Sequence, residues 1–213
     1  MKKKQSTMTT AMTLPRTLLL LMTTAMQATL AASTSSPLTS QLFPVPQDIE
    51  ITNPTATRSL SNIFTISTAT KQPDDVLVSA LQRYTSFIPM TKEPASTSTL
   101  DSLVLNVLGG STDASPIPTV DTDVSYILEI ETDNAIATIT ANTSFGVLYG
   151  LETFSQLVNS KGMIAGDGIT ITDAPEFRHR GLTIDVGRRF APIKLINSII
   201  DGLSYTKMNV LHM

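Results

Sequence analysis

The sequence predicts an α+β N-terminal domain, with a helix on a small sheet, followed by the first βα unit of a parallel α/β fold. Two observations carry this prediction. Between residues 41 and 172, apolar residues recur at strand spacing in some segments and at helical spacing in others. From residue 176 onward, an apolar strand, an amphipathic helix and the opening of a second apolar strand follow one another. The domains we expect are 33–172 and 173–213, divided at Asp173-Ala174-Pro175.

Two helices of the first domain are predicted from apolar residues that share one side. Pro73 precedes two acids that suit the first turn of a helix, and the segment Asp74–Ile88 repeats apolar residues along one face. A second helix, with Ser144 as its N-cap, carries apolar residues at i, i+4, i+7 and i+11, namely Val147, Leu151, Phe154 and Val158. We expect a helix of this kind to pack on the sheet.

Four segments of the same domain are predicted as strands. Ser102–Leu108 is almost continuously apolar, as a buried strand would be. Ser125–Glu131 and Ala135–Ala141 alternate apolar and polar residues on either side of a three-residue turn, which predicts a β-hairpin. Gly168–Thr172 is a short final strand. Residues 92–99 are expected to be a loop, and no element is predicted for residues 47–72.

The second domain opens with the strand Arg180–Asp185, which is apolar from Leu182 to Ile184. Pro192 lies where a helix would start. One face of that helix is apolar, with Leu195, Ile196, Ile199, Ile200 and Leu203. Met208–Leu211 then begins the next strand. This order of elements is the repeating unit of a parallel α/β fold.

Charge and composition narrow the classes of function. Of the 15 basic residues in the chain, four precede the first acid, Asp48, so eleven basic residues stand against 18 acidic ones in the remainder. A chain with this excess of acidic residues is poorly suited to bind the phosphate backbone of a nucleic acid, because the charges repel. The chain has no cysteine, which excludes disulfides and thiolate metal sites.

The first 32 residues have the order of a secretory signal peptide. Lys2, Lys3, Lys4 and Arg16 precede the uncharged segment 17–32, which ends in small residues suited to cleavage near Ala28 or Ala32. The alternative is a disordered N-terminus that contains a short apolar run. No segment has the length of a membrane span. We therefore expect a secreted protein or one in the lysosomal or vacuolar lumen.

Five basic residues lie between Arg178 and Lys194, around one short strand. They can anchor an oxygen-rich ligand, because a guanidinium donates several fixed hydrogen bonds, or they can pair with acids and orient the linker. Asp185 ends the strand, where it can face a ligand or accept backbone N–H groups of the next loop. Asp185 lies an odd number of residues after Arg180. In a regular strand the two side chains would therefore point to opposite faces. His212 is expected to be a buried, hydrogen-bonded histidine.

Other kinds of site have no pattern in the sequence. It contains no glycine-rich phosphate loop, no histidine pair at zinc spacing and no serine in a nucleophile elbow. We therefore expect neither a metal nor a cofactor. Asn142-Thr143-Ser144 is a glycosylation sequon, although a Thr/Ser-rich chain can contain one by chance.

The segment Phe177–Asp185, FRHRGLTID, resembles the F-x-H-R-G-hydrophobic-D signature of glycoside hydrolase family 20, the β-N-acetylhexosaminidases. The similarity continues through Arg188 and residues 190–192 into residues 199–212. Upstream, residues 43–47 and the segment 141–158 also resemble the family. The resemblance covers nearly all of the chain after the expected signal peptide.

The resemblance implies an α+β domain followed by a (β/α)8 barrel that removes terminal β-linked N-acetylglucosamine or N-acetylgalactosamine from oligosaccharides or glycoconjugates. In the family's substrate-assisted, retaining mechanism, the 2-acetamido oxygen of the sugar attacks the anomeric carbon. A glutamate protonates the leaving oxygen while the preceding aspartate orients the acetamido group. The matched Arg180 would grip sugar hydroxyls, and Asp185 is a second candidate. A homodimer of full-length chains is one expected assembly.

Three departures from the family pattern bear on this interpretation. The Asp-Glu pair of the mechanism does not occur in the 213 residues, so the barrel is expected to be truncated and the fragment inactive, with no catalytic residue of its own. Arg189 stands where the family usually has histidine, and Met213 where it has tryptophan. The alternative is a non-catalytic carbohydrate-binding or interaction module with a vestigial barrel stub.

Overall fold

The computed structural model of the protein describes residues 41–89, 99–109 and 116–213. The expected signal peptide and residues 92–98 of the expected loop lie outside this part of the chain. The last residue of that expected loop, Thr99, is the first residue of a strand.

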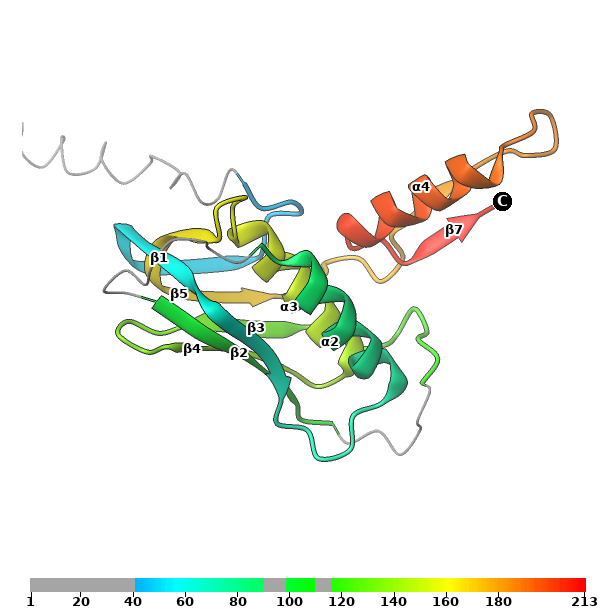
Figure 1. Ribbon diagram of the computed structural model, residues 1–213. Helices are drawn as coiled ribbons and strands as arrows, with labels where there is room; N and C mark the ends of the chain where they lie inside the picture. The colour runs from blue at the N-terminus through cyan, green and yellow to red at the C-terminus, as the bar shows by residue number, and fades with distance from the viewer. Residues whose placement is uncertain (1–40, 90–98, 110–115) are drawn as a thin grey trace, which may run out of the picture. The chain divides into compact units, whose positions relative to one another are not determined.

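Five strands form the sheet of the first domain: β1 (Asp48–Thr68), β2 (Thr99–Val107), β3 (Tyr126–Ile130), β4 (Ile136–Ala141) and β5 (Met163–Asp173). They pair in the order β1-β2-β4-β3-β5, and the sheet closes because β1 pairs with both β2 and β5 (Figure 1). The β1–β2 and β2–β4 pairs are parallel and the others antiparallel. A small sheet covered by a helix was expected, but its parallel pairs and its closure through β1 were not.

Strand β1 was missed because its sequence is polar and contains Pro54. Proline cannot donate to a strand ladder, so within a sheet it is found at edges and bulges. The structure accommodates it in this way, since the pairing of β1 with β5 shifts register between Asn53 and Thr57. The first part of β1 pairs with β5 and the second part with β2, so one long strand links both sides of the sheet.

The hairpin β3–β4 and strand β2 are confirmed. Burial alternates along β3, with Tyr126, Leu128 and Ile130 inward, as the period-two pattern predicted. Strand β5 begins at Met163, five residues before the expected Gly168. The predicted strand started only at Gly168, but the structural strand also contains Gly166, and these two glycines have φ +97° and +63°. Glycine adopts these angles without the strain that a side chain would bring.

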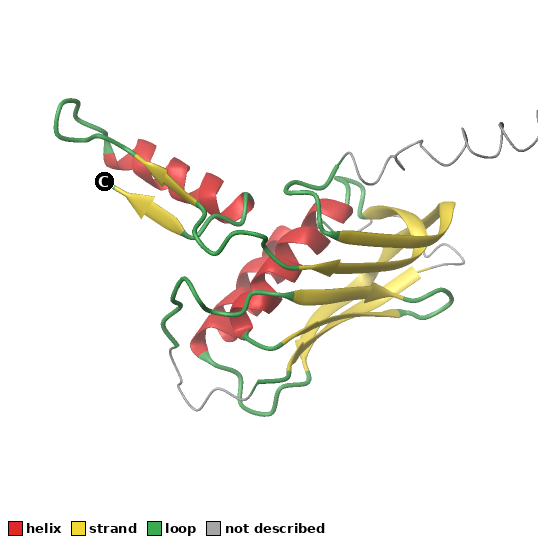
Figure 2. Cartoon of the chain, turned by 180° about the vertical axis from the view of Figure 1, so that it is seen from behind, coloured by secondary structure: helices red, strands yellow, loops and turns green. Residues whose placement is uncertain are grey.

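Helices α2 (Asp75–Phe87) and α3 (Ser144–Leu157) are confirmed, and they lie side by side against one face of the sheet (Figures 1 and 2). The N-cap of α3 is Thr143 rather than the expected Ser144, because the Thr143 hydroxyl accepts the Gly146 N–H at 3.1 Å. Ser144 instead donates its hydroxyl at 2.6 Å to Asp74, the N-cap of α2. The starts of the two helices are therefore joined directly.

The hydrophobic core fills the space between these helices and the sheet. Phe154 of α3 stacks on Phe64 of β1, with ring centroids 6.0 Å apart. The predicted face of α3 is buried, since Val147, Leu151 and Phe154 are fully inaccessible. Every buried apolar residue of the described chain lies between Leu42 and Ile171, so the first domain has a core of its own.

A buried ion pair stabilises the end of the sheet at which the β3–β4 turn lies. Arg58 of β1 is 1% exposed and bonds Asp167 of β5 at 2.8 Å. Its guanidinium also donates to the carbonyls of Thr99, Glu131 and Asn134. One side chain from the unpredicted strand therefore ties together the start of β2, the β3–β4 turn and β5.

The part of the chain after β5 was expected to be a second domain and is called the second domain below. It contains β6 (Gly181–Thr183), α4 (Ile193–Tyr205) and β7 (Val210–His212). Strands β6 and β7 pair in parallel, so the predicted strand–helix–strand unit is confirmed. Both strands are shorter than expected, and Arg180 and Asp185 lie just outside β6. No residue of α4 is buried, and Leu195 and Ile200 on its apolar face are 51% and 48% exposed.

Candidate functional site

The candidate site is centred on Arg180, which lies in the segment between β5 and β6 and is partly buried. Its guanidinium donates to the Phe177 carbonyl at 2.6 Å, the Lys207 carbonyl at 2.9 Å and the Tyr149 hydroxyl at 2.8 Å. It also lies over the Tyr149 ring, 5.7 Å from the ring centroid. A cation–π contact and several hydrogen bonds together hold a guanidinium in one orientation.

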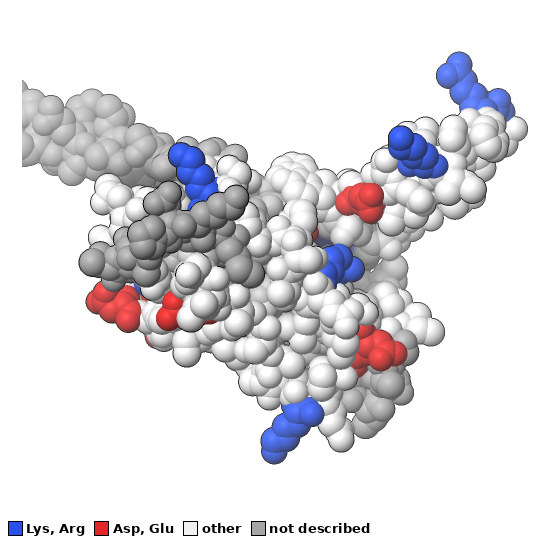
Figure 3. Space-filling view, viewed as in Figure 1, with Lys and Arg blue, Asp and Glu red and all other residues white. Residues whose placement is uncertain are grey.

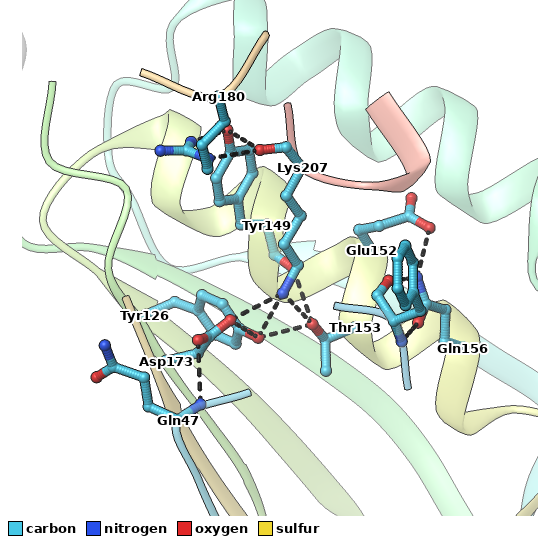
Figure 4. A network of polar contacts seen from close by, with 10 residues as sticks. Gln47, Tyr126, Tyr149, Glu152, Thr153, Gln156, Asp173, Arg180 and Lys207 are labelled. Carbon is cyan, nitrogen blue, oxygen red and sulfur yellow. Dashed lines mark hydrogen bonds and ion pairs between the residues drawn. The ribbon is translucent and has the colours of Figure 1, made fainter. Parts of the chain in front are cut away.

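Lys207 lies beside Arg180 and was missed by sequence reasoning. It follows α4, yet its side chain is 6% exposed and points into the first domain (Figure 4). Its ammonium bonds Asp173 at 2.9 Å, Tyr126 at 2.9 Å and Thr153 at 2.8 Å. Burial lowers the pKa of Lys207, and the Asp173 carboxylate opposes that change.

The partners of Lys207 also bond one another. The Tyr126 hydroxyl lies 2.6 Å from the Thr153 hydroxyl and donates to Asp173 at 3.0 Å. Burial and the neighbouring Asp173 charge raise the pKa of Tyr126 well above its ordinary value, so the phenol remains a neutral donor. Asp173 also accepts the backbone N–H of Gln47 at 3.3 Å. The network therefore joins β3, α3, the end of β5 and the segment before β1.

Open space adjoins Arg180 on two sides. A cleft of about 480 Å³ is lined by Arg180, Arg178, Asp121, Tyr149 and Asn209, among others. A second cleft of about 230 Å³ is lined by Arg180, Lys207 and Asp173 with their neighbours. A small polar ligand can therefore approach the guanidinium while its orientation stays fixed.

Two models of protein families match this chain. The model described as beta-acetyl hexosaminidase like matches residues 42–157, more than half of the chain. The model described as Glycosyl hydrolase family 20, catalytic domain, matches residues 177–213, which contain Arg180 and Lys207.

The chain belongs to glycoside hydrolase family 20.

Named relatives agree with this membership. The chain is 32% identical over 201 residues to beta-hexosaminidase subunit beta of Felis catus, covering 88% of this chain and 37% of the cat protein. It is 37% identical over 147 residues to the same subunit of Homo sapiens, covering 64% of this chain and 26% of the human protein. The chain thus spans about a third of the length of these relatives.

The fold also matches a solved family 20 structure. The X-ray structure of Flavobacterium johnsoniae chitobiase aligns with a TM-score of 0.60 at 24% identity, covering 81% of this chain and 26% of that chain. At this identity the likeness concerns the fold. It agrees with the mixed sheet and the two packed helices.

The family signature brings Arg180 and Asp185 close in sequence, but the structure gives them different surroundings. Asp185 follows β6, accepts the Gly187 N–H at 3.0 Å and lies 3.9 Å from the Arg188 guanidinium, with 64% of its side chain exposed. The expectation that Arg180 and Asp185 point to opposite faces of a strand does not apply, because β6 ends at Thr183.

Other basic residues near the signature pair with acids, as the structural interpretation predicted. Arg178 bonds Asp121 at 2.6 Å across an exposed surface, and Arg188 pairs with Asp185. On the face drawn in Figure 3, basic side chains of the described chain stand singly among uncharged residues. The expectation of a buried His212 was wrong, because this residue is exposed at the end of β7. Its backbone carbonyl accepts the Ile184 N–H at 2.8 Å.

The sequon residue Asn142 lies between β4 and α3 and is exposed. Its side-chain nitrogen, the atom to which a glycan would be attached, donates to Asp123 at 2.7 Å. Hydrogen bonds from Ser125 and Asn142 lower the pKa of Asp123, so this carboxylate is a strong acceptor.

Among the described residues, no group of three or more His, Cys, Asp or Glu side chains lies close enough together to bind a metal ion. None of the helices placed by the structure combines the length and hydropathy that a membrane crossing requires.

Proposed function

We propose that this protein acts as a β-N-acetylhexosaminidase that hydrolyses terminal β-linked N-acetylglucosamine or N-acetylgalactosamine of oligosaccharides and glycoconjugates. The observation that supports the proposal is the match of two family models in order, the second of which is a catalytic-domain model. The relatives named as beta-hexosaminidase subunits are consistent with it.

The proposed reaction is substrate-assisted and retains the anomeric configuration. The acetamido oxygen of the sugar forms a bond to the anomeric carbon as a glutamate gives its proton to the departing oxygen. Water then opens the cyclic intermediate and returns a proton to the glutamate. The 213 residues contain no Asp-Glu dipeptide, so this chain is not assigned either carboxylate of the reaction.

Arg180 is the proposed sugar-binding residue of this chain. A guanidinium carries five N–H groups. In Arg180 one donor of Nε, two of Nη1 and one of Nη2 have acceptors. Nη2 keeps a second N–H without an acceptor among the described residues, on a side chain that lines two clefts. A donor held in one orientation can bond a sugar hydroxyl with little further loss of entropy.

Asp185 is proposed as a second sugar-binding residue through its place in the fold. We propose that β6, α4 and β7 are the first part of a (β/α)8 barrel. In such barrels the loops after the strands build the active site, and Asp185 lies in the loop after β6. Its exposed carboxylate can accept hydrogen bonds from sugar hydroxyls.

The decisive experiment reads the transcript beyond the codon for Met213 and assays its complete product. We expect a reading frame with an Asp-Glu pair after an apolar strand, and release of 4-nitrophenol from its β-N-acetylglucosaminide. The purified 213-residue chain should release none. Inactivity of the complete product, or turnover by the 213-residue chain free of host enzyme, would contradict the proposal.

A matched pair of variants tests the role of Arg180 in the complete product. Arg180→Lys should lower kcat/KM by about tenfold to a hundredfold, because lysine cannot reproduce the fork of donors. Arg178→Lys changes an exposed neighbour and should leave kcat/KM within about twofold. Equal effects of the two substitutions would remove Arg180 from the sugar site.

A non-catalytic carbohydrate-binding or interaction module is the second candidate. It is favoured by the self-contained core of the first domain, which includes no residue of α4. It requires the transcript to end at codon 213 and the chain to bind an immobilised chitooligosaccharide without cleaving it.

The remaining proposals concern the setting of the enzyme. We propose export to the outside of the cell or to the lysosomal or vacuolar lumen, directed by residues 1–32. We further propose a glycan at Asn142, exposed in the structure, and a homodimer of complete chains. Peptide mapping of the exported protein would show cleavage near Ala28 or Ala32 and a mass increase at Asn142.

A further inference from the structure

Lys207 is the one residue of the segment after α4 whose side chain is buried in the first domain. It follows α4 in the sequence, but all three acceptors of its ammonium lie in the closed sheet or in α3. They come from three elements: Tyr126 from β3, Thr153 from α3 and Asp173 from the end of β5. A buried ammonium is stable only when its donors are satisfied and its charge is offset.

The backbone of Lys207 has a second set of contacts, directed at Arg180. Its carbonyl accepts the Arg180 Nε–H at 2.9 Å and the Tyr149 hydroxyl at 3.1 Å. The residue has φ +56°, a left-handed conformation that is uncommon for a residue with a side chain. This conformation places the ammonium in its buried cage while the carbonyl bonds the guanidinium.

We propose that Lys207 is a positioning residue for Arg180: its buried ammonium anchors the end of α4 to the first domain, and the anchored carbonyl orients the guanidinium. Tyr149 completes the arrangement, because its hydroxyl bonds both the Lys207 carbonyl and Arg180. The importance of this role for sugar binding rests on the proposed function, whereas the positioning itself can be measured without a sugar.

The charges around Lys207 explain why the anchor depends on Asp173. Arg180 is a second cation nearby and disfavours the charged form of Lys207, as burial does, while Asp173 and Glu152 favour it. Only the Asp173 carboxylate is in direct contact with the ammonium. Loss of that carboxylate should therefore weaken the anchor even when the lysine is retained.

The test follows the Arg180 Nε–H by ¹⁵N-edited NMR on the 213-residue chain. The signal is assigned by its absence in Arg180→Lys. We expect it to be shifted and protected in the natural sequence. In Lys207→Met its exchange with water should become about tenfold faster or more, as expected for loss of a charge-assisted hydrogen bond. Lys207→Arg, which keeps the charge, should restore part of the protection.

Two further variants separate positioning from general stability. Tyr84→Phe removes a buried hydroxyl bond to Glu152 in the same domain and should leave the Arg180 signal unchanged. Asp173→Asn keeps a hydrogen-bond acceptor near Lys207 and should cause a smaller loss of protection of the Arg180 Nε–H. If Lys207→Met does not fold, this variant tests the proposal in its place. An unchanged Arg180 signal in folded Lys207→Met, or in Asp173→Asn where only that variant folds, would overturn the proposal.

Titration with N-acetylglucosamine then tests the proposed function separately. A shift of the Arg180 signal with sugar, weakened in Lys207→Met, would support both proposals. Protection that depends on Lys207 without any response to sugar would support the positioning and count against Arg180 as a sugar ligand.

Discussion

The two domains of this chain are held together by different kinds of interaction. The first domain buries its helices and sheet in a continuous apolar core. The second buries no residue of α4, and it is attached to the first domain by the polar network of Lys207, Arg180 and Tyr149 (Figure 4). The first domain is therefore stabilised mainly by hydrophobic burial, and the attachment of the second depends on hydrogen bonds and ion pairs.

This difference explains where each class of residue can carry function. Residues inside the first domain contribute to stability, because removal of apolar volume leaves a cavity. The polar residues at the junction are satisfied by one another and still adjoin open clefts. Arg180 can therefore be both structurally held and accessible to a ligand.

The largest expected effect compares the same substitution in the two domains. Leu151→Ala in α3, at a fully buried position, should lower the free energy of unfolding by about 2–5 kcal/mol. Leu195→Ala in α4, at a position 51% exposed, should change it by less than about 0.5 kcal/mol. Urea denaturation followed by circular dichroism measures both. Similar losses of unfolding free energy in the two variants would show that α4 is packed in solution. The two domains would then not differ in hydrophobic burial.

The next effect concerns alkaline pH. Burial, with the Glu152 charge, raises the pKa of Tyr84, and burial with the Asp173 charge raises that of Tyr126. For both tyrosines the folded-state pKa lies above the unfolded value of about 10, so their stabilising contribution is complete below that pH and is lost as pH rises above it. Lys207 has the opposite effect at lower pH, because its folded-state pKa lies below its unfolded value of about 10.4. Between these two pKa values it makes the free energy of unfolding rise with pH.

The free energy of unfolding should therefore fall with increasing pH once the pH exceeds about 10.4. Tyr84→Phe removes one of the two responsible groups and should reduce the slope. Urea titrations at a series of pH values measure it. A slope that is the same in the natural sequence and in Tyr84→Phe would show that Tyr84 does not contribute to the alkaline sensitivity.

The smallest effect concerns the helix starts. The Thr143 side chain caps α3, whereas the N-cap of α4 is Pro192, which offers no side-chain bond. Thr143→Ala should cost about 1 kcal/mol of unfolding free energy. Thr143→Ser keeps the hydroxyl and should cost only a few tenths of that. A full loss in the serine variant would mean that the methyl group, and not the cap, stabilises this helix start.

Local patterns in the sequence were sufficient for much of the fold. The faces of α2 and α3, the β3–β4 hairpin and the order of β6, α4 and β7 each follow from spacing within a few residues. The family signature around Arg180 is also continuous in the chain, so it was visible in the sequence and is matched by the catalytic-domain model.

The residues that complete the site were decided by tertiary structure. Strand β1 is polar and contains a proline, but it is a strand because β2 and β5 supply its hydrogen bonds from either side. Lys207 reads as an ordinary residue after a helix, yet its ammonium meets Tyr126, 81 residues earlier in the chain. The sequence by itself determined the helices, the hairpin and the family, because their signals are local. Only the folded chain determined the closure of the sheet and the cage around Lys207, because those depend on partners that no short segment contains.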